Sequence, residues 1–460
     1  MLLRSEKNAQ REPDISEVYD YRKLLALVEG RKATVGIIGL GYVGLPLALA
    51  AARAGVSAKG FDLDTSKIIS LSQGRSYIRH ISNESVHEAI VSGRFTATTD
   101  FSMLRTMDVI IICVPTPITK NCSPDINYII RAAESIRRHL RQGQLIVLES
   151  TTYPGTTTGE LREILEQSGL ISGRDFYLAF SPEREDPGND RFTTIHIPKI
   201  VGGHGAEATV IAETLYRSFG IKTVTVSSPD TAEAVKLTEN VFRSVNIAMV
   251  NELKVVFGRM GIDIWEVIQA ADTKPFGFMA FYPGPGVGGH CIPADPYFLT
   301  ARAREFNLSA RLVEIACEIN RTMPQHVIDG IARALDQHSQ RGLAGSHILV
   351  MGAAYKKNID DMRDSPSLHL IQILMERGAK VDYHDTYVPL IPKLHEFPNL
   401  DGLRSVPITP ESLARYQAVV VGTDHDGVDY EMVATHANLA IDTRNIFGRL
   451  GLVADNIVKL

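Results

Sequence analysis

One strand–turn–helix segment near the N-terminus constrains the fold of this chain more than any other. Residues 33–55 read ATVGIIGLGYVGLPLALAAARAG, a short β-rich run that leads through a glycine turn into an Ala/Leu-rich helix. Gly39, Gly41 and Gly44 have the G-x-G-x-x-G spacing of a turn that binds a dinucleotide. The next β-rich run, SAKGFDLD, brings Asp62 about 20 residues after this turn, where an acid binds the ribose hydroxyls of adenosine. Since an acid also repels the 2′-phosphate of NADP, the segment predicts a Rossmann domain that binds NAD.

The length and charge of the chain limit the classes of protein to which it can belong. A chain of 460 residues exceeds one ordinary hydrophobic core, so we expect two or three domains. Its net charge of −5 argues against a general nucleic-acid binder. No apolar run approaches the length of a membrane span, and the N-terminal segment lacks the apolar stretch of a secretory signal. The four cysteines form no C-x-x-C pair and no zinc-ligand motif, so we expect a cytoplasmic protein without a bound metal.

Further β-rich runs follow the first segment, and each ends in polar residues. They are VIIICVPTP at 109–117, LIVLESTTYPGTT at 145–157 and DFYLAFSPERED at 175–186. Ligands of open α/β sheets bind beyond the carboxyl ends of the strands, so we expect these ends to line one crevice. The residues expected there are Pro115, Thr116, Glu149, Ser150, Thr151, Ser181 and Glu183.

The pattern changes near residue 230 and then returns. AEAVKLTENVFRSVNIAMVNELKVVFGRMG has helical periodicity and no proline, which predicts one long helix or two nearly continuous ones. Residues 345–460 repeat the α/β pattern without a G-x-G-x-x-G turn, which predicts a domain for a mononucleotide or a similar ligand. We therefore predict an α/β protein with two Rossmann-like domains joined by a long central helical region. The expected parts are an N-terminal extension at 1–32 that could form a solvated amphipathic helix, a NAD-binding domain at 33–228, a central helical domain at 229–335 and a C-terminal Rossmann-like domain at 336–460.

The central region contains GPGVGGHCIPADP at 284–296, where glycines and prolines surround Cys291. This composition predicts a loop with a tightly specified backbone, which a ligand can approach closely. Cys113 and Cys317 lie in apolar runs and are expected to pack in cores, and Cys122 lies in a polar loop with no evident partner. A thiolate combined with NAD indicates attack on an aldehyde to form a thiohemiacetal, which loses hydride and leaves a thioester. We expect nearby amides and cations to lower the pKa of the Cys291 thiol.

The chain resembles the UDP-sugar 6-dehydrogenases, the family of UDP-glucose dehydrogenase, from residue 33 to residue 447. The motifs that carry the resemblance are GLGYVGLP, ICVPTP, LESTTYPGTT, SPERE, AEAVKLTEN, GPGVGGHCIPADP, YKKNIDDMRDSP and DTRN. SPEREDPGN and TKPFGF are most similar to the bacterial branch acting on UDP-N-acetylhexosamines, especially the UDP-N-acetylglucosamine 6-dehydrogenases. The resemblance implies a four-electron, NAD-dependent oxidation at C6 to a uronic acid for surface polysaccharide synthesis. It also implies a C-terminal domain that binds the UDP-sugar, and a homodimer or higher oligomer built on the central helices.

The resemblance implies catalytic roles for residues of the central region and of the first domain. Cys291 matches the nucleophile. Lys236 and Asn240, one helical turn apart, match the pair that steadies the oxyanion at C6. Asp295 matches a carboxylate that handles protons and positions water, and Thr151 matches a hydroxyl that orders the hydrolytic water.

Glu183 in SPE matches a candidate general base. The family pattern has a second acid four places later, where this chain has Pro187. Glu185 and Asp186 are shifted from that position, so the role of a second acid is in doubt.

The resemblance also implies two sets of binding residues. The cofactor set is Gly39, Gly41, Tyr42, Val43, Gly44, Asp62, Lys67, Pro115, Thr116 and Thr151. The substrate set is Glu183, Arg184, Lys236, Asn240, Phe276, Tyr282, Gly284, Gly288, Lys357 and Arg444. Lys357 and Arg444 fit this assignment by charge, because a UDP-sugar carries a diphosphate.

Three alternatives stay open. No single residue decides the substituent at C2 of the sugar, so a UDP-glucose or UDP-N-acetylmannosamine 6-dehydrogenase with the same mechanism also fits. An ordinary two-electron hydroxyacid dehydrogenase would use a lysine on the central helix but would not require the thiol of Cys291. A non-catalytic NAD-binding sensor would bind NAD and form no NADH with any UDP-sugar, and the assembled Cys, Lys, Asn and Asp set argues against it.

Overall fold

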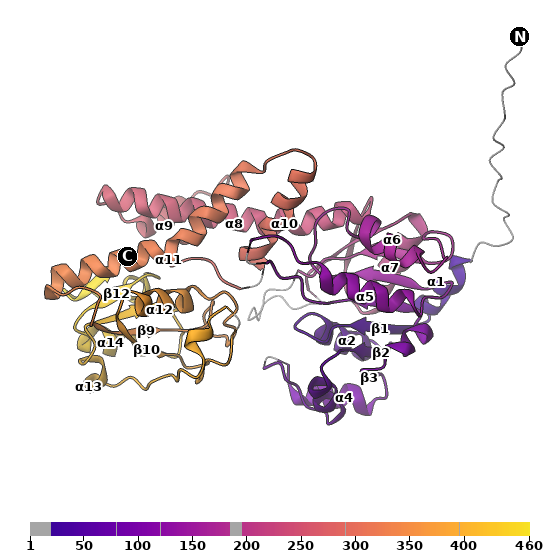
Figure 1. Ribbon diagram of the computed structural model, residues 1–460, viewed down its shortest axis with the longest axis horizontal. Coiled ribbons are helices and arrows are strands. Elements are labelled where there is room, and N and C mark those ends of the chain that lie inside the picture. The colour runs from indigo at the N-terminus through magenta and orange to yellow at the C-terminus, as the bar shows by residue number, and fades with distance from the viewer. Residues whose placement is uncertain (1–19, 80, 120, 185–195, 290, 395) are drawn as a thin grey trace, which may run out of the picture. The chain divides into compact units, whose positions relative to one another are not determined.

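The computed structural model describes residues 20–79, 81–119, 121–184, 196–289, 291–394 and 396–460 (Figure 1). The described residues fall into two compact units. The first contains 20–116, 126–184 and 196–234, and the second contains 117–125 and 235–460. Each unit is built on its own sheet, as the predicted pair of Rossmann-like domains requires.

The first unit holds an eight-stranded sheet in the order β3-β2-β1-β4-β5-β6-β7-β8. The first six positions are parallel and follow the strand order of dinucleotide-binding domains, and β7 then runs antiparallel to β6. The strands are β1 (Thr34–Ile38), β2 (Ser57–Phe61), β3 (Phe95–Thr98), β4 (Val109–Ile112), β5 (Leu145–Leu148), β6 (Tyr177–Phe180), β7 (Lys199–Gly203) and β8 (Thr223–Val226). The helices are α1 (Tyr21–Glu29), α2 (Gly44–Arg53), α3 (Thr65–Ser72), α4 (Asn83–Val91), α5 (Asn127–Arg137), α6 (Arg162–Glu166) and α7 (Ala206–Ser218).

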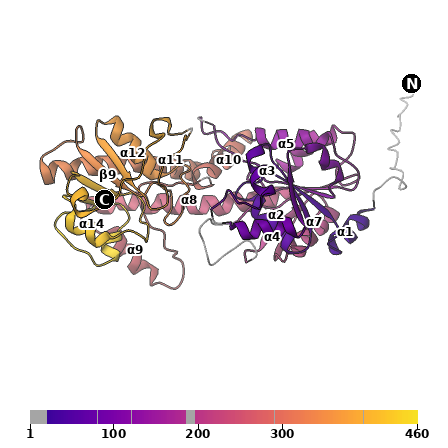
Figure 2. The ribbon, with the colours of Figure 1, turned by 90° about the horizontal axis from the view of Figure 1, so that it is seen from below.

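Helices cover both faces of this sheet because its central strands are apolar at every position. All four residues of β4, β5 and β6 are buried, which is typical of parallel strands packed on two sides. Alternate residues such as Val35 and Ile37 of β1 join the core formed with α1, α2, α4 and α7. Figure 2 shows α5 on one side of the sheet and α2, α4 and α7 on the other.

Helix α1 forms inside the predicted N-terminal extension, but it is not a solvated helix. Asp20 caps it by accepting a hydrogen bond from the backbone nitrogen of Arg22. Leu24 and Val28, four residues apart on one face, are buried in the same core as α7. The expectation of a solvated helix is therefore wrong for 21–29, and 1–19 lie outside the described residues.

The second unit begins with long helices and ends with a parallel sheet. Helix α8 is continuous, as the sequence predicts for this segment, and its portion beyond Ala234 belongs to this unit. The helices are α8 (Pro229–Arg259), α9 (Ile264–Asp272), α10 (Cys291–Glu305), α11 (Arg311–Ser339), α12 (Pro366–Glu376), α13 (Pro410–Leu413), α14 (Tyr430–His436) and α15 (Ile446–Arg449). The strands are β9 (His347–Met351), β10 (Lys380–His384), β11 (Ala418–Val421), β12 (Ala440–Asp442) and β13 (Ile457–Lys459).

The five strands of this second sheet are all parallel, in the order β10-β9-β11-β12-β13. Ile348 and Val350 of β9 face a core with α11 and α12, whereas Leu349 and Met351 face a core with α13, α14 and α15. This alternation places helices on both faces, as in an open doubly wound domain.

Candidate active site

The glycine turn between β1 and α2 has the shape that a dinucleotide diphosphate requires. Gly39 has a φ of +93°, and a Cβ on it would lie 2.4 Å from the carbonyl oxygen of Cys113. A Cβ on Gly44 would lie 1.9 Å from the carbonyl oxygen of Gly39, so the helix can start this close only with a glycine. A Cβ on Gly41 would meet nothing within 4 Å. The backbone at Gly41 therefore faces open space, and the turn fits the approach of the NAD diphosphate.

Asp62 follows β2 directly, at the carboxyl end where the sequence predicts it. Its Oδ2 accepts hydrogen bonds from the backbone nitrogen of Leu40, at 2.9 Å, and from Nζ of Lys67, also at 2.9 Å. These bonds hold the carboxylate beside the glycine turn, so two predicted cofactor contacts lie together. Tyr42 is exposed and Val43 is partly exposed on the same turn. The geometry suits a carboxylate that accepts from ribose hydroxyls, and the NAD contacts of these residues stay predictions.

The polar residues that follow β4, β5 and β6 lie at one edge of the first sheet, but several of them turn inward. The buried ones are Thr116, Glu149, Ser150 and Ser181. Ser150 Oγ donates to the carbonyl oxygen of Val114 at 2.8 Å, and Ser181 Oγ donates to that of Ile200 at 2.7 Å. The expectation that all these residues line a crevice is therefore wrong, because the antiparallel strand β7 and the neighbouring loops bury part of the edge. Those that keep some exposure are Pro115, Thr151, Glu183 and Arg184.

A buried ion pair that the sequence analysis missed lies at this edge. Nζ of Lys199 is 2.9 Å from Oε2 of Glu149, and the hydroxyl of Tyr216 donates to Oε1 of Glu149 at 2.5 Å. Burial raises the pKa of the Glu149 carboxyl, and the charge of Lys199 opposes that rise. Glu149 is therefore a fixed part of the domain, whereas Glu183 nearby keeps some exposure and can face a ligand.

The loop that presents Thr151 is held by a second buried acid that the sequence analysis missed. Glu233, on the first turns of α8, accepts from the backbone nitrogens of Gly155 at 2.6 Å and Thr157 at 2.9 Å. It also accepts from Oγ1 of Thr157 at 2.7 Å. Burial raises the pKa of Glu233 to about 7, and these hydrogen bonds lower it less. Glu233 thus caps the π-helical turn Thr157–Leu161 and fixes the loop before it.

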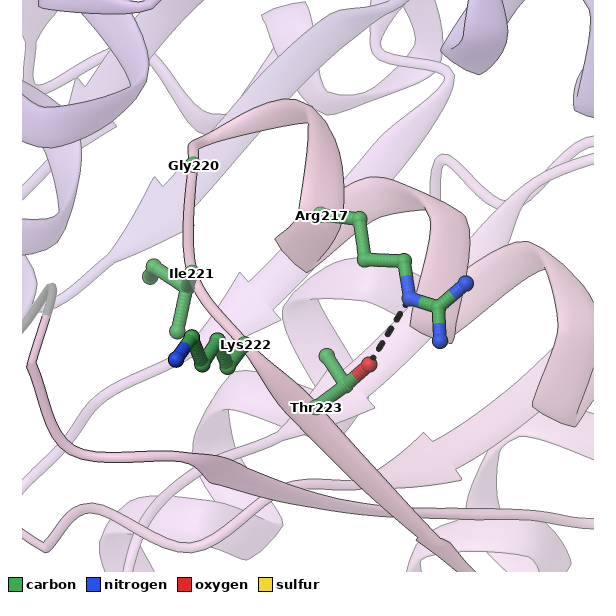
Figure 3. A pocket seen from close by; sticks show the side chains of 5 residues that line it. All are labelled: Arg217, Gly220, Ile221, Lys222 and Thr223. Atoms are coloured by element: carbon green, nitrogen blue, oxygen red, sulfur yellow. Dashed lines mark hydrogen bonds between the residues drawn. The ribbon is translucent and has the colours of Figure 1, made fainter.

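An open hollow lies next to the edge strand β8, and none of the predicted site residues lines it. Figure 3 shows its lining residues, Arg217, Gly220, Ile221, Lys222 and Thr223. Arg217 donates to Oγ1 of Thr223 at 3.1 Å and forms an ion pair with Glu213. The hollow is a gap between the end of α7 and the start of β8, and Arg217 in its lining is already paired with Glu213.

In the second unit, Cys291 is the first residue of α10 and not part of the preceding loop. The prediction of one loop through 284–296 is therefore wrong from Cys291 onward. The prediction was wrong because prolines do not indicate a loop in every position. Pro293 lies in the first helical turn, where a missing N–H costs nothing, and Pro296 lies inside the helix. The consequence is chemical, because Cys291 and Asp295 come to lie four residues apart on one face of α10.

Helix α8 brings three polar side chains to Asp295. The amide Nδ2 of Asn240 donates a hydrogen bond to Oδ2 of Asp295. Oδ1 of the same amide accepts from Nη2 of Arg243, a residue that the sequence analysis missed although it lies one turn after Asn240. Lys236 is buried, and its charge acts on both Asp295 and Cys291. The structure therefore brings together Lys236, Asn240, Cys291 and Asp295, four of the six residues to which the motifs give catalytic roles.

The electrostatics of this cluster differ from the prediction for the thiol. Burial raises the pKa of Asp295 to about 6, and Lys236, Asn240 and Arg243 lower it less. Burial, followed by the charge of Asp295, raises the pKa of the Cys291 thiol, and the nearby cations oppose the rise without reversing it. The expectation of a lowered pKa for the Cys291 thiol is therefore wrong, because a carboxylate and a desolvated position outweigh the cations. A thiol with a raised pKa needs a base to become a thiolate, and the ionised carboxylate of Asp295 lies one helical turn away.

The glycines of 284–289 are explained first by packing within the second unit. A Cβ on Gly288 would lie 2.7 Å from side-chain atoms of Tyr355 and Pro366, and the backbone nitrogen of Gly289 donates to the carbonyl oxygen of Arg363 at 2.9 Å. On the other side, the backbone nitrogen of Gly284 donates to Oδ1 of Asn251 at 3.1 Å. The loop is thus pinned between α8 and the segment that contains YKKNIDDMRDSP.

Arg444 and Lys357, the two cations predicted to bind the diphosphate, lie in different surroundings. Nε of Arg444 donates to the carbonyl oxygen of Gly422 at 2.9 Å, and its Nη1 would lie 2.6 Å from a Cβ on Gly284. Lys357 is exposed and pairs with Asp426 at 3.1 Å. Arg444 therefore borders the glycine loop, whereas Lys357 is engaged on the surface.

Two aromatic residues of the substrate set precede the glycine loop. The ring of Tyr282 stacks on Trp265 of α9 with centroids 5.5 Å apart. Phe276 is 71% exposed, with Nζ of Lys274 over its ring. Their contacts with a substrate stay predictions.

In the described part of the C-terminal sheet, the acid that follows β10 is not free to bind a ribose. Asp385, directly after β10, accepts from the backbone nitrogen of Ala353 at 2.6 Å and from His425 at 3.0 Å. It also accepts from the backbone nitrogens of Tyr387 and Val388. Because its oxygens are used inside the domain, this sheet does not reproduce the dinucleotide site of the first unit.

Comparison with known proteins agrees with two Rossmann-like domains joined by a central helical region. Models of the UDP-glucose/GDP-mannose dehydrogenase family match residues 33–220 as the NAD binding domain, 230–322 as the central domain and 349–449 as the UDP binding domain. The chain belongs to this dehydrogenase family. It is therefore an NAD-dependent UDP-sugar dehydrogenase.

Relatives of this dehydrogenase cover almost its whole length. It is 34% identical over 393 residues to the UDP-N-acetyl-D-glucosamine 6-dehydrogenase of Pseudomonas aeruginosa, covering 85% of this chain and 90% of the relative. It is 34% identical over 418 residues to the UDP-N-acetyl-D-mannosamine dehydrogenase of Pyrococcus horikoshii, covering 90% and 95%. A solved structure of UDP-D-ManNAc dehydrogenase from that archaeon superimposes with a TM-score of 0.81 at 32% identity, covering 93% and 98%. Among the residues that the structure describes, no helix of this dehydrogenase is long and apolar enough to cross a membrane.

Proposed function

We propose that this dehydrogenase oxidises the C6 hydroxyl of a UDP-N-acetylhexosamine to the uronic acid, through an aldehyde and a covalent adduct on Cys291. The best-supported substrate is UDP-N-acetylglucosamine, and the product class serves surface polysaccharide synthesis. The observation that carries the proposal is the gathering of the partly exposed Cys291 with the buried Asp295, Asn240 and Lys236.

The chemistry of the cluster follows from its charges. Asp295, ionised above pH 6, accepts the proton of the Cys291 thiol, one helical turn away. The sulfur then adds to the aldehyde carbon, and the carbonyl oxygen gains negative charge. The Lys236 ammonium stabilises that charge. Nδ2 of Asn240 carries two hydrogens, of which one goes to Asp295, so the second is available to the same oxygen.

The atoms and electrons of the proposed sequence balance. The alcohol loses a hydride and a proton to become the aldehyde, and the thiohemiacetal loses a second hydride and a proton to become the thioester. Water then adds to the thioester carbon and the carbon–sulfur bond breaks, which gives the acid and the free thiol. NAD, which Gly39, Gly41, Gly44 and Asp62 would hold, supplies the acceptor for one hydride in each oxidation. Thr151 and Glu183 are proposed to order and activate the water, on the strength of their motifs.

The choice of sugar rests on the SPEREDPGN and TKPFGF motifs and on the relatives. One relative at 34% identity acts on UDP-N-acetyl-D-glucosamine and another at 34% acts on UDP-N-acetyl-D-mannosamine, so identity alone does not rank the two sugars. The bacterial motifs favour the glucosamine derivative. UDP-glucose is the alternative without an N-acetyl group.

An apolar stripe on α8 supports a homodimer or higher oligomer. Phe242, Met249 and Val256 recur every seven residues along one line of the helix and are 48%, 44% and 40% exposed. A seven-residue apolar repeat matches the contact line of packed helices. We propose that a second copy covers this stripe. The four unpaired cysteines support the proposal of a reducing, cytoplasmic location.

The test is NADH stoichiometry with a panel of UDP-sugars. We expect two NADH per sugar, with the highest kcat/KM for UDP-N-acetylglucosamine among the N-acetylated sugars and UDP-glucose. One NADH per sugar would instead indicate an ordinary two-electron dehydrogenase. No NADH with any UDP-sugar would indicate a sensor.

A further inference from the structure

Lys254 is a buried cation for which the described residues provide no hydrogen-bond partner. Its side chain is 8% exposed, and its Nζ has no partner among the residues that the structure describes. It stands one turn after Asn251 on α8, and Asn251 accepts a hydrogen bond from the backbone nitrogen of Gly284. Lys254 therefore lies on the same face of α8 as Asn251, the residue that contacts the glycine loop.

A second cation lies beside it. After burial, the charge of Arg444 has the largest effect on the pKa of Lys254, and its guanidinium occupies the space next to Gly284 that a larger side chain would take. Apart from the bond from Nε to Gly422, no side-chain hydrogen bond of Arg444 is seen within the described part of the chain. Lys254 thus interacts with a second cation that itself borders the start of the glycine loop.

The acids near these cations are already engaged. Asp442 accepts from the backbone nitrogens of Arg444 at 2.9 Å and Phe447 at 3.0 Å, and its pKa is raised by burial. Asp424 pairs with Arg449. His326 of α11 also feels the charge of Lys254, which helps to lower the pKa of the imidazole. Within the part of the chain that the structure describes, these cations therefore lie without a free anion to match them.

We propose that Lys254 is a further substrate-binding residue, whose ammonium binds a phosphoryl oxygen of the UDP-sugar together with Arg444. This inference rests on the proposed function and adds to it a contact that the motifs do not assign. An unpaired ammonium is costly to bury, and a diphosphate is the part of the substrate that matches two cations. Burial lowers the pKa of Lys254 to about 8, so the group is still largely charged at neutral pH.

The test compares Lys254→Met with the unchanged enzyme by isothermal titration with UDP, UMP and uridine. We expect the Kd for UDP to rise roughly 10- to 100-fold, as for loss of a charge-assisted bond, and the Kd for uridine to stay within about twofold. The thermal midpoint of the variant without ligand should be equal or higher, because methionine fills the same space without a buried charge. Lys380→Met, at an exposed position at the start of β10, is the matched control and should leave all three affinities unchanged.

Two results would overturn the inference. The first is a Lys254→Met variant that binds UDP as tightly as the parent. The second is an equal loss for UDP and uridine, which would place Lys254 against the nucleoside or show that the loop has collapsed. Failure of the proposed function is separate, because it would appear as absent NADH formation in the parent enzyme while UDP binding still depends on Lys254.

Discussion

The Asn240 amide of α8 donates a hydrogen bond to the buried Asp295 carboxylate of α10. This bond orients an acid whose pKa burial raises to about 6, one helical turn from Cys291. We expect kcat to fall as pH decreases through about 6, because a protonated Asp295 can no longer accept a proton. Asp295→Asn should remove this acidic limb and lower kcat by roughly 10²-fold. A pH profile of both enzymes checks the prediction, and an unchanged limb in the variant would contradict it.

The same raised pKa has a consequence for stability. Because the folded state binds this proton more tightly than the unfolded state, Asp295 favours folding below about pH 4, and that contribution is lost as pH rises through about 6. Asp295→Asn should therefore flatten the fall in the free energy of unfolding between these values. Urea titrations at several pH values measure it, and a fall as steep as that of the parent would contradict the raised pKa.

Glu233 should contribute more to the free energy of unfolding than Asp230, which lies one turn earlier on α8. Glu233→Ala leaves the backbone nitrogens of Gly155 and Thr157 buried without an acceptor, so we expect a loss of roughly 2–4 kcal/mol in the free energy of unfolding. Asp230→Ala is the control, since among the described residues Asp230 accepts from the partly buried hydroxyl of Thr158 alone, and should cost under about 1 kcal/mol. Equal losses in the two variants, measured by urea unfolding, would refute the capping role.

Asp62 should set the preference for NAD over NADP. Asp62→Asn removes the charge that repels a 2′-phosphate and weakens the bond to the ribose, so the KM for NAD should rise roughly tenfold and the preference should shrink. Asp64→Asn is the control, because Asp64 caps α3 by accepting from the backbone nitrogen and the hydroxyl of Ser66. Steady-state kinetics with both cofactors decide the matter. A preference unchanged in Asp62→Asn would show that another residue selects NAD.

The stripe on α8 should hold two copies together. Met249→Glu places a charge at the centre of the stripe, and we expect the oligomer to dissociate at micromolar concentration. Val453→Glu, at a position that is 94% exposed outside the stripe, should leave the assembly unchanged. Analytical ultracentrifugation measures both. A Met249→Glu enzyme with the parent's mass would exclude this face as the interface.

Much of the fold could be predicted because the local spacing of glycines and apolar residues determines its secondary structure. The turn at Gly39 requires a positive φ and close packing, so its spacing indicates its structure. Strands β1, β2, β4, β5 and β6 of the first domain and β9 to β12 of the second followed from period and length, whereas β3, β7, β8 and β13 were not predicted.

Features that depend on distant segments could not be predicted. Lys199 and Glu149 meet only because β7 turns back beside β6, and nothing in either local sequence reveals that pairing. The helical start at Cys291 was hidden by prolines, which also occur in loops. Arg243 could have been found, since it lies one turn from Asn240 on the predicted helix.

The account depends on a bond between the Cys291 sulfur and the sugar, and acid-quenched mass spectrometry during turnover tests it most directly. With a UDP-N-acetylhexosamine and NAD, the peptide that contains Cys291 should carry the mass of the uronyl thioester, and Cys291→Ala should lose both the adduct and release of the acid. No adduct in the parent, together with a Cys291→Ala enzyme that still forms two NADH per sugar at the parent's rate, would contradict the account.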